Sequence, residues 1–332
     1  MISGLIDVHT HIVPTEFPAA PEGQQTRWPC MRCENAQSAT IMMGDKPFRA
    51  LDNRAWDVTR RLADMDRDGV TMQVLSPMPE LLSYWFPAAD TLRLGRYVNG
   101  AIAEMIAQAP ARFAGLGTVP LQDPGLAAKE LHVIKHEFGL AGVEIGSNVL
   151  GTVLGDPRFD IFYAAAEELD LAIFVHALHP VGAERLSDPL LTALIAFPLD
   201  TALTAASIIA AGVLDRFPKL RLGFSHGGGA LLPVLHRLEH GWRQTEGFGG
   251  KVPEPPSAYA ARMFYDSLVY DAAYLRHLTQ SLAPGRIFSG TDYPFAIQQE
   301  DLADFLNRAG LDSAAQDDLC AGAAKRFLGL VE

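Results

Sequence analysis

The chain has 332 residues, of which 48% are apolar and 20% are charged, so it can bury a large core and shows no signature of disorder. Its 27 basic and 39 acidic residues give a net charge of −12, which argues against a nucleic-acid or anionic-membrane partner. The longest uncharged stretch near the middle, residues 201–214, is shorter than the roughly 18 apolar residues that span a bilayer, so we expect no membrane partner.

The cysteines indicate a reducing compartment. Three cysteines are too few for a disulfide framework, and the N-terminal residues lack the basic region of a signal peptide, so we expect a cytoplasmic protein. Cys30 and Cys33 form a CxxC pair, but no second pair or nearby pair of histidines completes a zinc motif. We interpret both as ordinary thiols.

Short β-rich runs alternate along the chain with longer helical patterns, which is typical of βα units around a parallel sheet. Several runs, such as residues 171–175, are apolar throughout, as a strand buried on both faces requires. The predicted strands are residues 4–8, 70–76, 113–119, 141–145, 171–175, 220–225, 263–266 and 286–289. The predicted helices are residues 57–68, 89–108, 124–137, 156–169, 201–214, 230–242 and 272–280. This pattern predicts an α/β protein with a (β/α)8 TIM barrel, for which about 250 residues suffice.

We expect one domain over residues 1–332. Its largest irregular segment, residues 13–53, follows the first strand directly and is rich in Pro, Gly and polar residues. A loop at this place lies over the catalytic end of a barrel, so the segment is predicted to be a cap inserted within the domain. The tail from residue 301 has a helical pattern and is expected to pack on the outside.

Histidines stand at the C-terminal ends of the predicted strands, where barrel enzymes carry their active sites. His9 and His11 end the first strand, and their spacing of two residues points both imidazoles the same way. His176 ends the fifth strand, and Asp292 follows the eighth. Together they offer three nitrogens and one oxygen to a catalytic divalent ion and leave room for water or substrate, which suits Zn²⁺ first.

A further histidine, His226, ends the sixth strand and precedes three glycines, which would let the backbone approach the site closely. His179 lies just beyond His176 and is a candidate for facing the pocket. A lone histidine at a strand end is more often a hydrogen-bonded structural residue. The metal hypothesis therefore rests on the convergence of several such ends at one face of the barrel.

Short motifs spread over nearly the whole chain carry a family resemblance. They are IDVHTH at 6–11 with Pro14, IMMG at 41–44 with FR at 48–49, residues 65–70, VPLQD at 119–123, FSHGGG at 224–229, residues 237–243, and GTDYPF at 290–295. With these motifs the chain resembles the amidohydrolase superfamily, and within it the decarboxylase branch typified by 2-amino-3-carboxymuconate 6-semialdehyde decarboxylase.

The resemblance implies the function of individual residues. It implies one divalent metal, zinc first with manganese, iron or cobalt as alternatives, held by His9, His11, His176 and Asp292. It also implies acid–base catalysis by His226 on metal-bound water, a substrate carboxylate held by Arg49, and a pocket lined by Phe295. We add His179 as a candidate substrate-binding residue and Asp292 as a second candidate for proton transfer. The branch is typically homodimeric, with an arginine that follows the glycine-rich motif and reaches into the neighbour's site.

The chain departs from that branch at two positions. Thr245 stands where the second arginine is expected, with Arg243 two residues earlier. The loss of a bidentate carboxylate clamp would alter the choice of substrate. Glu144 stands on the fourth strand where a neutral amide is expected, and we predict that it hydrogen-bonds within the barrel rather than bridging two metals.

The sequence therefore predicts an enzyme that acts on a small carboxylate. The first hypothesis is a metal-dependent nonoxidative decarboxylase of an unsaturated or aromatic carboxylic acid, a carbon–carbon lyase of aromatic catabolism. The alternative is a metal-dependent hydrolase or hydratase of a related ring-cleavage metabolite that opens a lactone, amide or ester, because the same constellation could run either reaction. A binding or structural protein that uses the ion for stability is a third reading, against which an open coordination position argues.

Overall fold

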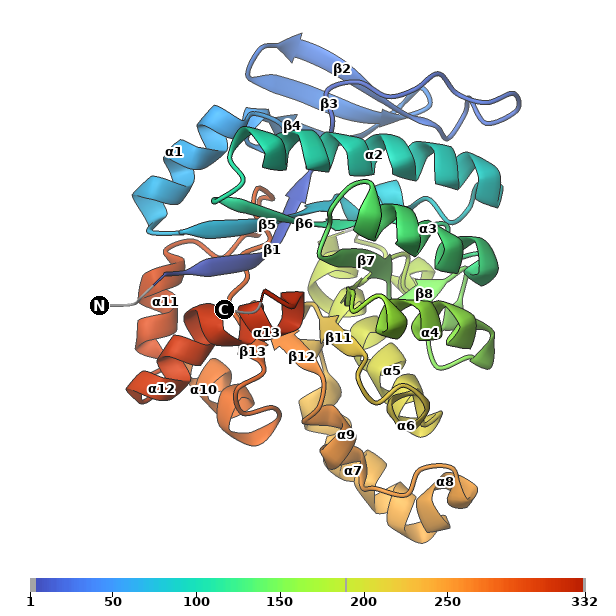
Figure 1. Cartoon of the computed structure of the whole chain (residues 1–332), viewed down its shortest axis with the longest axis vertical. Coiled ribbons are helices and arrows are strands. Elements are labelled where there is room, and N and C mark those ends of the chain that lie inside the picture. Colours follow the sequence, from blue (N-terminus) through green and yellow to red (C-terminus); the bar gives the residue numbers. More distant parts are fainter. Residues whose placement is uncertain (1–3, 189, 331–332) are drawn as a thin grey trace.

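The computed structural model describes residues 4–188 and 190–330. Eight parallel strands lie side by side in one sheet around the centre of the molecule (Figure 1). In sheet order they are β1 (Ile6–Ile12), β5 (Met72–Pro77), β6 (Phe113–Gly117), β7 (Gly142–Gly146), β10 (Ala172–His176), β11 (Arg221–Phe224), β12 (Phe264–Asp266) and β13 (Ile287–Phe288).

Hydrogen bonds between β1 and the segment that follows β13 close this sheet into a barrel. The Val8 amide donates to the Ser289 carbonyl at 2.9 Å, and the His11 amide donates to the Tyr293 carbonyl at 2.7 Å. The predicted (β/α)8 barrel is therefore confirmed. All eight strands run the same way, so their C-terminal ends, which carry the histidines, gather at one face.

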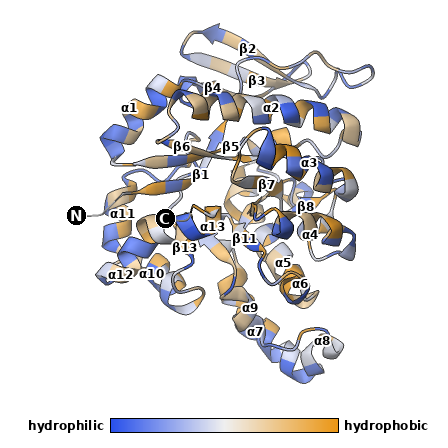
Figure 2. Ribbon diagram, in the orientation of Figure 1, coloured by the Kyte–Doolittle hydropathy of each residue, from blue (hydrophilic) through white to orange (hydrophobic). Residues whose placement is uncertain are grey.

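Helices surround the barrel, and most begin and end on recognisable signals. Asp57 caps the first helix by accepting a hydrogen bond from the Arg60 amide, and the helix ends at Gly69 in a left-handed conformation. Helices α1 and α2 carry both hydrophobic and hydrophilic residues, as helices that cover a barrel must (Figure 2). The longer helices are α1 (Val58–Asp68), α2 (Ala88–Gln108), α3 (Pro124–His136), α4 (Asp160–Glu168), α5 (Phe197–Ala210), α7 (Leu231–Gln244) and α10 (Ala272–Ser281). The shorter ones are α6 (Val213–Arg216), α8 (Glu246–Gly250), α9 (Pro256–Ala260), α11 (Leu302–Arg308), α12 (Ser313–Asp317) and α13 (Ala323–Leu328).

The strands are apolar on both faces because one face points into the barrel and the other meets the helices. On β10, Phe174 belongs to the cluster inside the barrel, whereas Ile173 and Val175 pack in the larger cluster between strands and helices. All five residues of β10 are buried. This two-sided burial explains why the strand segments read as continuous apolar runs.

The C-terminal tail is helical as predicted, but its expected position on the outside was wrong for α13. Phe327 of α13 is fully buried and belongs to the cluster inside the barrel, where its ring lies 5.0 Å from that of Phe288. A Cβ on Gly223 would come within 2.9 Å of the Phe327 ring, so β11 needs a glycine there. The tail therefore covers the N-terminal end of the barrel, opposite the histidines.

The segment after β1 contains an antiparallel three-stranded sheet rather than an irregular loop. Its strands, β2 (Pro29–Asn35), β3 (Ser38–Met43) and β4 (Lys46–Asp52), lie at the edge of the molecule beside α1 and α2 (Figure 1). Gly44 between β3 and β4 has a positive φ of 60°, and a Cβ there would come within 2.3 Å of the Thr26 carbonyl oxygen. Only glycine fits this turn.

One helical stretch in the described part of the chain, Thr192–Ala210, is long and apolar enough to cross a membrane by length and composition alone. It joins a π-helical turn, Thr192–Ala196, to α5. Of its most apolar window, 44% is buried inside the structure, as in a helix that packs on a barrel. Its other face carries exposed leucines, which bear on the assembly considered below.

Candidate metal centre and pocket

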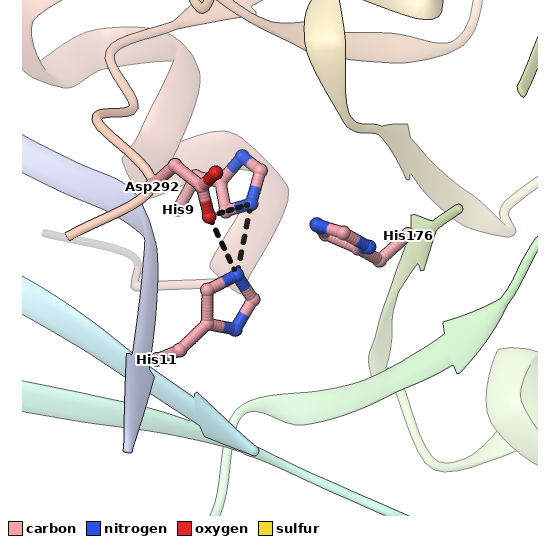
Figure 3. Close-up of side chains that lie close together, drawn as sticks. All are labelled: His9, His11, His176 and Asp292. Atoms are coloured by element: carbon pink, nitrogen blue, oxygen red, sulfur yellow. Dashed lines mark hydrogen bonds and ion pairs between the residues drawn. The ribbon is translucent and has the colours of Figure 1, made fainter. Parts of the chain in front are cut away.

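Four side chains converge at the C-terminal end of the barrel and form a site for one divalent ion (Figure 3). His9 and His11 come from β1, His176 from the end of β10, and Asp292 from the loop after β13. Their ligand atoms all lie within 4.8 Å of one another. His9 Nε2 lies 3.1 Å from His11 Nε2, and Asp292 Oδ1 lies 3.5 Å and 3.1 Å from these two nitrogens. The structure thus brings together the four residues that the sequence predicted.

The other ring nitrogen of each histidine is held by an acceptor. His11 Nδ1 donates to the Pro77 carbonyl at 3.0 Å, and His176 Nδ1 donates to the Ala177 carbonyl at 2.9 Å. His9 Nδ1 bonds to the Asp266 carboxylate at 2.6 Å. Since carbonyl oxygens only accept, these contacts leave the Nε2 lone pairs of His11 and His176 directed at the centre of the site, as in histidines that bind metals, while the Asp266 carboxylate holds the Nδ1 side of His9.

The site fits a cation because it leaves buried polar atoms without partners. His176 Nε2 and Asp292 Oδ1 are buried and make no hydrogen bond within the described residues. Burial lowers the pKa of His176 well below its usual value, helped by the neighbouring His9, so its imidazole is neutral and free to donate its lone pair. Burial also disfavours the ionised form of Asp292, but the neighbouring imidazoles of His11 and His9 outweigh it and keep the pKa of this carboxyl low. A neutral imidazole and a carboxylate are the forms that bind a divalent ion.

His226 lies beside these ligands at the start of the glycine-rich loop after β11. Its ring centroid is 5.1 Å from that of His176 and 5.6 Å from that of His9, and the ring lines the pocket. Burial lowers the pKa of His226 to about 4, although the Asp266 charge opposes this. The imidazole is therefore neutral at neutral pH and can accept a proton. It does not belong to the four-ligand group.

Asp266, the last residue of β12, is a site residue that the sequence reasoning missed. Its carboxylate is fully buried and accepts hydrogen bonds from the His9 ring and from the backbone amides of His226 and Gly227. The rule that picked out the histidines, a polar residue at the C-terminal end of a predicted strand, would also have picked out Asp266. Asp266 ends a predicted strand, at the same kind of position as the histidines.

A cavity of about 400 Å³ opens beside the metal ligands. Arg49 of β4 lines it, with its guanidinium 4.3 Å from the centroid of the Phe295 ring. The Phe295 ring in turn stacks on His11 at 5.0 Å. Burial lowers the pKa of Arg49, although the charges of Asp292 and Glu80 favour its cationic form. The structure thus places a partly desolvated cation and a flat aromatic wall next to the metal ligands.

His179 lies at the rim of this cavity, as the sequence suggested. Its Nε2 is 3.1 Å from both carboxylate oxygens of Glu80, which also lines the cavity. The imidazole stacks on Trp85 with ring centroids 4.8 Å apart. Glu80 and Trp85 come from the segment after β5, and no sequence motif singled them out. An acidic group therefore lines the same cavity as the cation of Arg49.

Glu144 on β7 lies behind the metal ligands, fully buried, with its Oε2 3.7 Å from His11 Nδ1. Neither carboxyl oxygen has a partner with full hydrogen-bond geometry among the described residues, and the Ser76 hydroxyl of β5 interacts with the carboxyl only weakly, so the predicted hydrogen bond within the barrel is not fully formed. Burial raises the pKa of Glu144 to about 8, so the carboxyl is mostly protonated at pH 7. Glu144 is not one of the four grouped ligands, which agrees with the expectation of one metal rather than two.

The stretch around Arg243 makes only local contacts within this protomer. Arg243 pairs with Glu239 one turn earlier on α7, at 3.3 Å. Thr245 donates to the Gly241 carbonyl at 2.8 Å and accepts from the Phe248 amide at 3.2 Å, so it links α7 to α8. Neither side chain lines the cavity of its own protomer.

Comparison with known proteins places this chain in a family. The amidohydrolase family model matches residues 6–330. The chain is 34% identical to 2-amino-3-carboxymuconate-6-semialdehyde decarboxylase from Dictyostelium discoideum, over 98% of this chain and 91% of that protein. It is 25% identical to gamma-resorcylate decarboxylase from a Polaromonas strain, over 90% of this chain and 95% of that protein. Its structure resembles that of 5-carboxyvanillate decarboxylase from Sphingomonas paucimobilis, with a TM-score of 0.83 and 28% identity over 98% of this chain and 99% of that one. The chain therefore belongs to the amidohydrolase family, in the branch of decarboxylases similar to 2-amino-3-carboxymuconate-6-semialdehyde decarboxylase.

Proposed function

We propose that this protein is a metal-dependent nonoxidative decarboxylase of an aromatic or unsaturated carboxylic acid. The observation that carries the proposal is the juxtaposition of a three-histidine, one-carboxylate metal site with Arg49 and Phe295 in one cavity. This pair suits a planar acid, because guanidinium binds carboxylate and the ring stacks on a conjugated system. The similarity to several decarboxylases supports the same reaction.

The residues of the chain divide the work of such a reaction. A divalent ion on His9, His11, His176 and Asp292 would polarise an oxygen of the substrate and stabilise negative charge as it develops. Arg49 orients the carboxylate, and Phe295 holds the conjugated plane. The bond between the substrate's ring or chain carbon and its carboxyl carbon breaks, and CO₂ leaves. The electron pair of the broken bond stays on the ring or chain carbon. The neutral His226 takes up a proton from solvent and delivers it to the same carbon, which completes a C–H bond and replaces the lost carboxylate.

We propose zinc as the resident metal, with manganese, iron or cobalt as alternatives. Three imidazole nitrogens and one carboxylate oxygen suit zinc in a catalytic site. The same donors also accept the other three ions, so the donor set alone favours zinc without excluding them. Metal analysis of the purified protein, together with reconstitution by each ion, tests the assignment.

We also propose that the substrate carries a hydrogen-bond donor rather than a second carboxylate at the rim of the pocket. Glu80 and His179 occupy that rim, and Glu80 would repel a second negative charge. Thr245 and Arg243 supply no second cation to the pocket of their own protomer. A hydroxyl or amino substituent would instead find the acceptor oxygens of Glu80.

The surface of residues 190–203, at the start of the long apolar helical stretch, supports the proposal of a homodimer. Leucine and isoleucine side chains at helical spacing form an outward apolar face, in which each residue is between 38% and 56% exposed. They are Leu191, Leu194, Ile195, Leu199 and Leu203. The same segment supplies Leu190, Ala193 and Phe197 to the pocket wall, so a second copy on this face would steady that wall. The interface that we propose therefore lies beside α5, whereas the sequence suggested the stretch around Arg243.

The remaining proposals concern organisation and location. Residues 13–53 act as a cap within a single barrel domain, because β4 brings Arg49 to the pocket wall, whereas β2 and β3 belong to the same sheet but do not line the pocket. A cytoplasmic location agrees with the free thiols of Cys30, Cys33 and Cys320.

A substrate screen tests the proposed reaction. Aromatic and muconate-type carboxylic acids are incubated with the zinc-loaded protein while CO₂ release and ultraviolet absorbance are followed. Decarboxylation gives CO₂ in equal amount to the acid consumed, whereas a hydrolase or hydratase gives a new acid or hydroxyl and no CO₂. A matched sample stripped with a chelator should be inactive and should recover activity when the ion is restored. Turnover without CO₂ would reject the proposal in favour of hydrolysis.

A further inference from the structure

We propose that Asp266 is a positioning residue that fixes, with one carboxylate, both the metal ligand His9 and the backbone of His226. The first half of this inference rests only on the metal site, and the second half rests on the proposed function. Asp266 ends β12, is fully buried, and does not belong to the metal-ligand group itself. It therefore acts through its neighbours rather than on substrate.

The contact with His9 sets which nitrogen of that ring meets the metal. Asp266 Oδ2 lies 2.6 Å from His9 Nδ1, and both side chains are fully excluded from solvent. Because a carboxylate is the acceptor, Nδ1 carries the proton and Nε2 faces His11 and Asp292. Without this acceptor the His9 ring could adopt the opposite tautomer or rotate, and either change would remove one metal ligand.

The same carboxylate holds the loop that carries His226. Oδ2 also accepts from the His226 amide at 2.9 Å, and Oδ1 accepts from the Gly227 amide at 2.7 Å and the Leu268 amide at 3.1 Å. His226 has a φ of 56°, a left-handed conformation that residues with a side chain rarely adopt. The hydrogen bonds from the His226 and Gly227 amides to Asp266 fix this conformation, which places the imidazole beside the metal ligands.

The number of these bonds explains why a carboxylate is required. Four N–H donors point at the two oxygens of Asp266, and all of them are buried or nearly so. Asparagine has the same shape but only one acceptor oxygen, and its NH₂ group would confront at least one of these donors. The substitution Asp266→Asn therefore changes hydrogen bonding with little change in volume.

The first experiment measures zinc affinity by competition with a chelator. The zinc dissociation constant of Asp266→Asn should be about 10- to 100-fold larger than that of the wild type, which is the usual effect of losing the hydrogen-bond partner of a ligating histidine. The control is Glu130→Gln, which alters another buried carboxyl, on α3, whose partner is Arg96 of α2 rather than a metal ligand. Its zinc affinity should be unchanged. Equal affinity of Asp266→Asn and the wild type would overturn the first half of the proposal.

A measurement on the wild type keeps the test independent of whether the variant folds. In ring ¹⁵N–¹H spectra of the zinc-loaded protein, His9 should show a hydrogen-bonded proton on Nδ1 and none on Nε2. A proton on Nε2 would overturn the proposal. This readout and the zinc affinity need no substrate, so they remain valid if the proposed decarboxylation fails.

The second half is tested with zinc at saturation and a substrate from the screen. Saturating zinc restores coordination by His9 in the Asp266→Asn variant, but the loop that carries His226 still lacks its hydrogen bonds to Asp266. Asp266→Asn should then keep a KM near that of the wild type and lose at least about 10-fold in kcat, because misplacement of a proton-transfer group acts on the chemical step. Full recovery of kcat at saturating zinc would show that Asp266 serves the metal ligand alone and would overturn this half.

Discussion

Arg49 provides a sharp test of how the pocket binds its substrate. We expect Arg49→Met to weaken substrate recognition while leaving the fold intact, because methionine keeps the apolar stem but removes the guanidinium. No carboxylate of the described chain forms an ion pair with Arg49, and its main contact is the ring of Phe295 at 4.3 Å. The guanidinium is partly desolvated without a fixed partner, which is the state of a group that waits for an anion.

The magnitude follows from the bonds that the guanidinium would make. Hydrogen bonds to a charged group are worth about 1.5–3 kcal/mol, which corresponds to a loss of about 10- to 150-fold in kcat/KM. The lost cation–π contact is worth about 0.5–2 kcal/mol, but removal of the desolvated charge offsets it. We therefore expect the free energy of unfolding to change by less than about 1 kcal/mol.

The assay compares wild type, Arg49→Met and Arg49→Lys on a substrate from the screen, with urea unfolding in parallel. Lysine restores the charge but not the planar fork that binds carboxylate and stacks on Phe295, so it should recover only part of the loss. Values of kcat/KM for Arg49→Met within about 3-fold of the wild type would refute the reasoning, since even one charged hydrogen bond exceeds that range.

Three further predictions address the remaining parts of the molecule. His226→Ala should lower kcat by about 10²- to 10⁴-fold while zinc content stays at the wild-type level; loss of zinc would make His226 a ligand instead. Leu194→Asp should convert the dimer into a monomer in sedimentation experiments, whereas a wild type that is monomeric at all concentrations would contradict the interface. Burial disfavours the Asp64 carboxylate, but hydrogen bonds from Arg60 and the Tyr293 hydroxyl outweigh it and lower its pKa. The stability it contributes is present at neutral pH and is lost progressively as the pH falls below about 4 and through its lowered pKa, so Asp64→Asn should lose about 1–2 kcal/mol in urea unfolding at pH 7 and less at pH 3. A loss that is the same at both pH values would contradict this assignment.

The barrel could be predicted because its strands are buried on both faces. Each predicted strand overlaps an observed one; residues 171–175, for example, correspond to Ala172–His176. A continuous apolar run of this length between helical patterns has few other interpretations. Once the strands are parallel, the positions of their C-terminal ends follow, and with them the meeting of His9, His11, His176 and Asp292.

The sheet inserted after β1 could not be predicted in the same way. Strand β2 is exposed along most of its length, and β4 is exposed or half-buried except at Leu51. A sheet with so little buried surface lacks the alternation of apolar and polar residues that identifies an antiparallel strand. Its pairing comes from contacts with the barrel and between strands, such as Pro29 opposite Met43.

The rim of the pocket lay beyond sequence reasoning for a different reason. Glu80 and Trp85 belong to an irregular segment after β5, and their contacts with His179 join residues about a hundred positions apart. No local pattern encodes such a contact, because the loop conformations are set by packing rather than by propensity. Asp266 differs, since the strand-end rule that found the histidines would also have found it.

The glycines after His226 are needed for a different reason from the one that the sequence suggested. The sequence suggested that they let the backbone approach the site. In the structure the close approach is to the scaffold instead, since a Cβ on Gly228 would come within 2.7 Å of the Tyr265 ring and one on Gly229 within 1.9 Å of the Pro198 carbonyl. The loop is wedged between β12 and the start of α5, and both glycines have positive φ angles. Rigid packing of these glycines and the hydrogen bonds to Asp266 therefore act together. They hold His226 in a conformation that a freely moving loop would rarely adopt, and this fixes the proton-transfer group relative to the metal ligands before any substrate arrives.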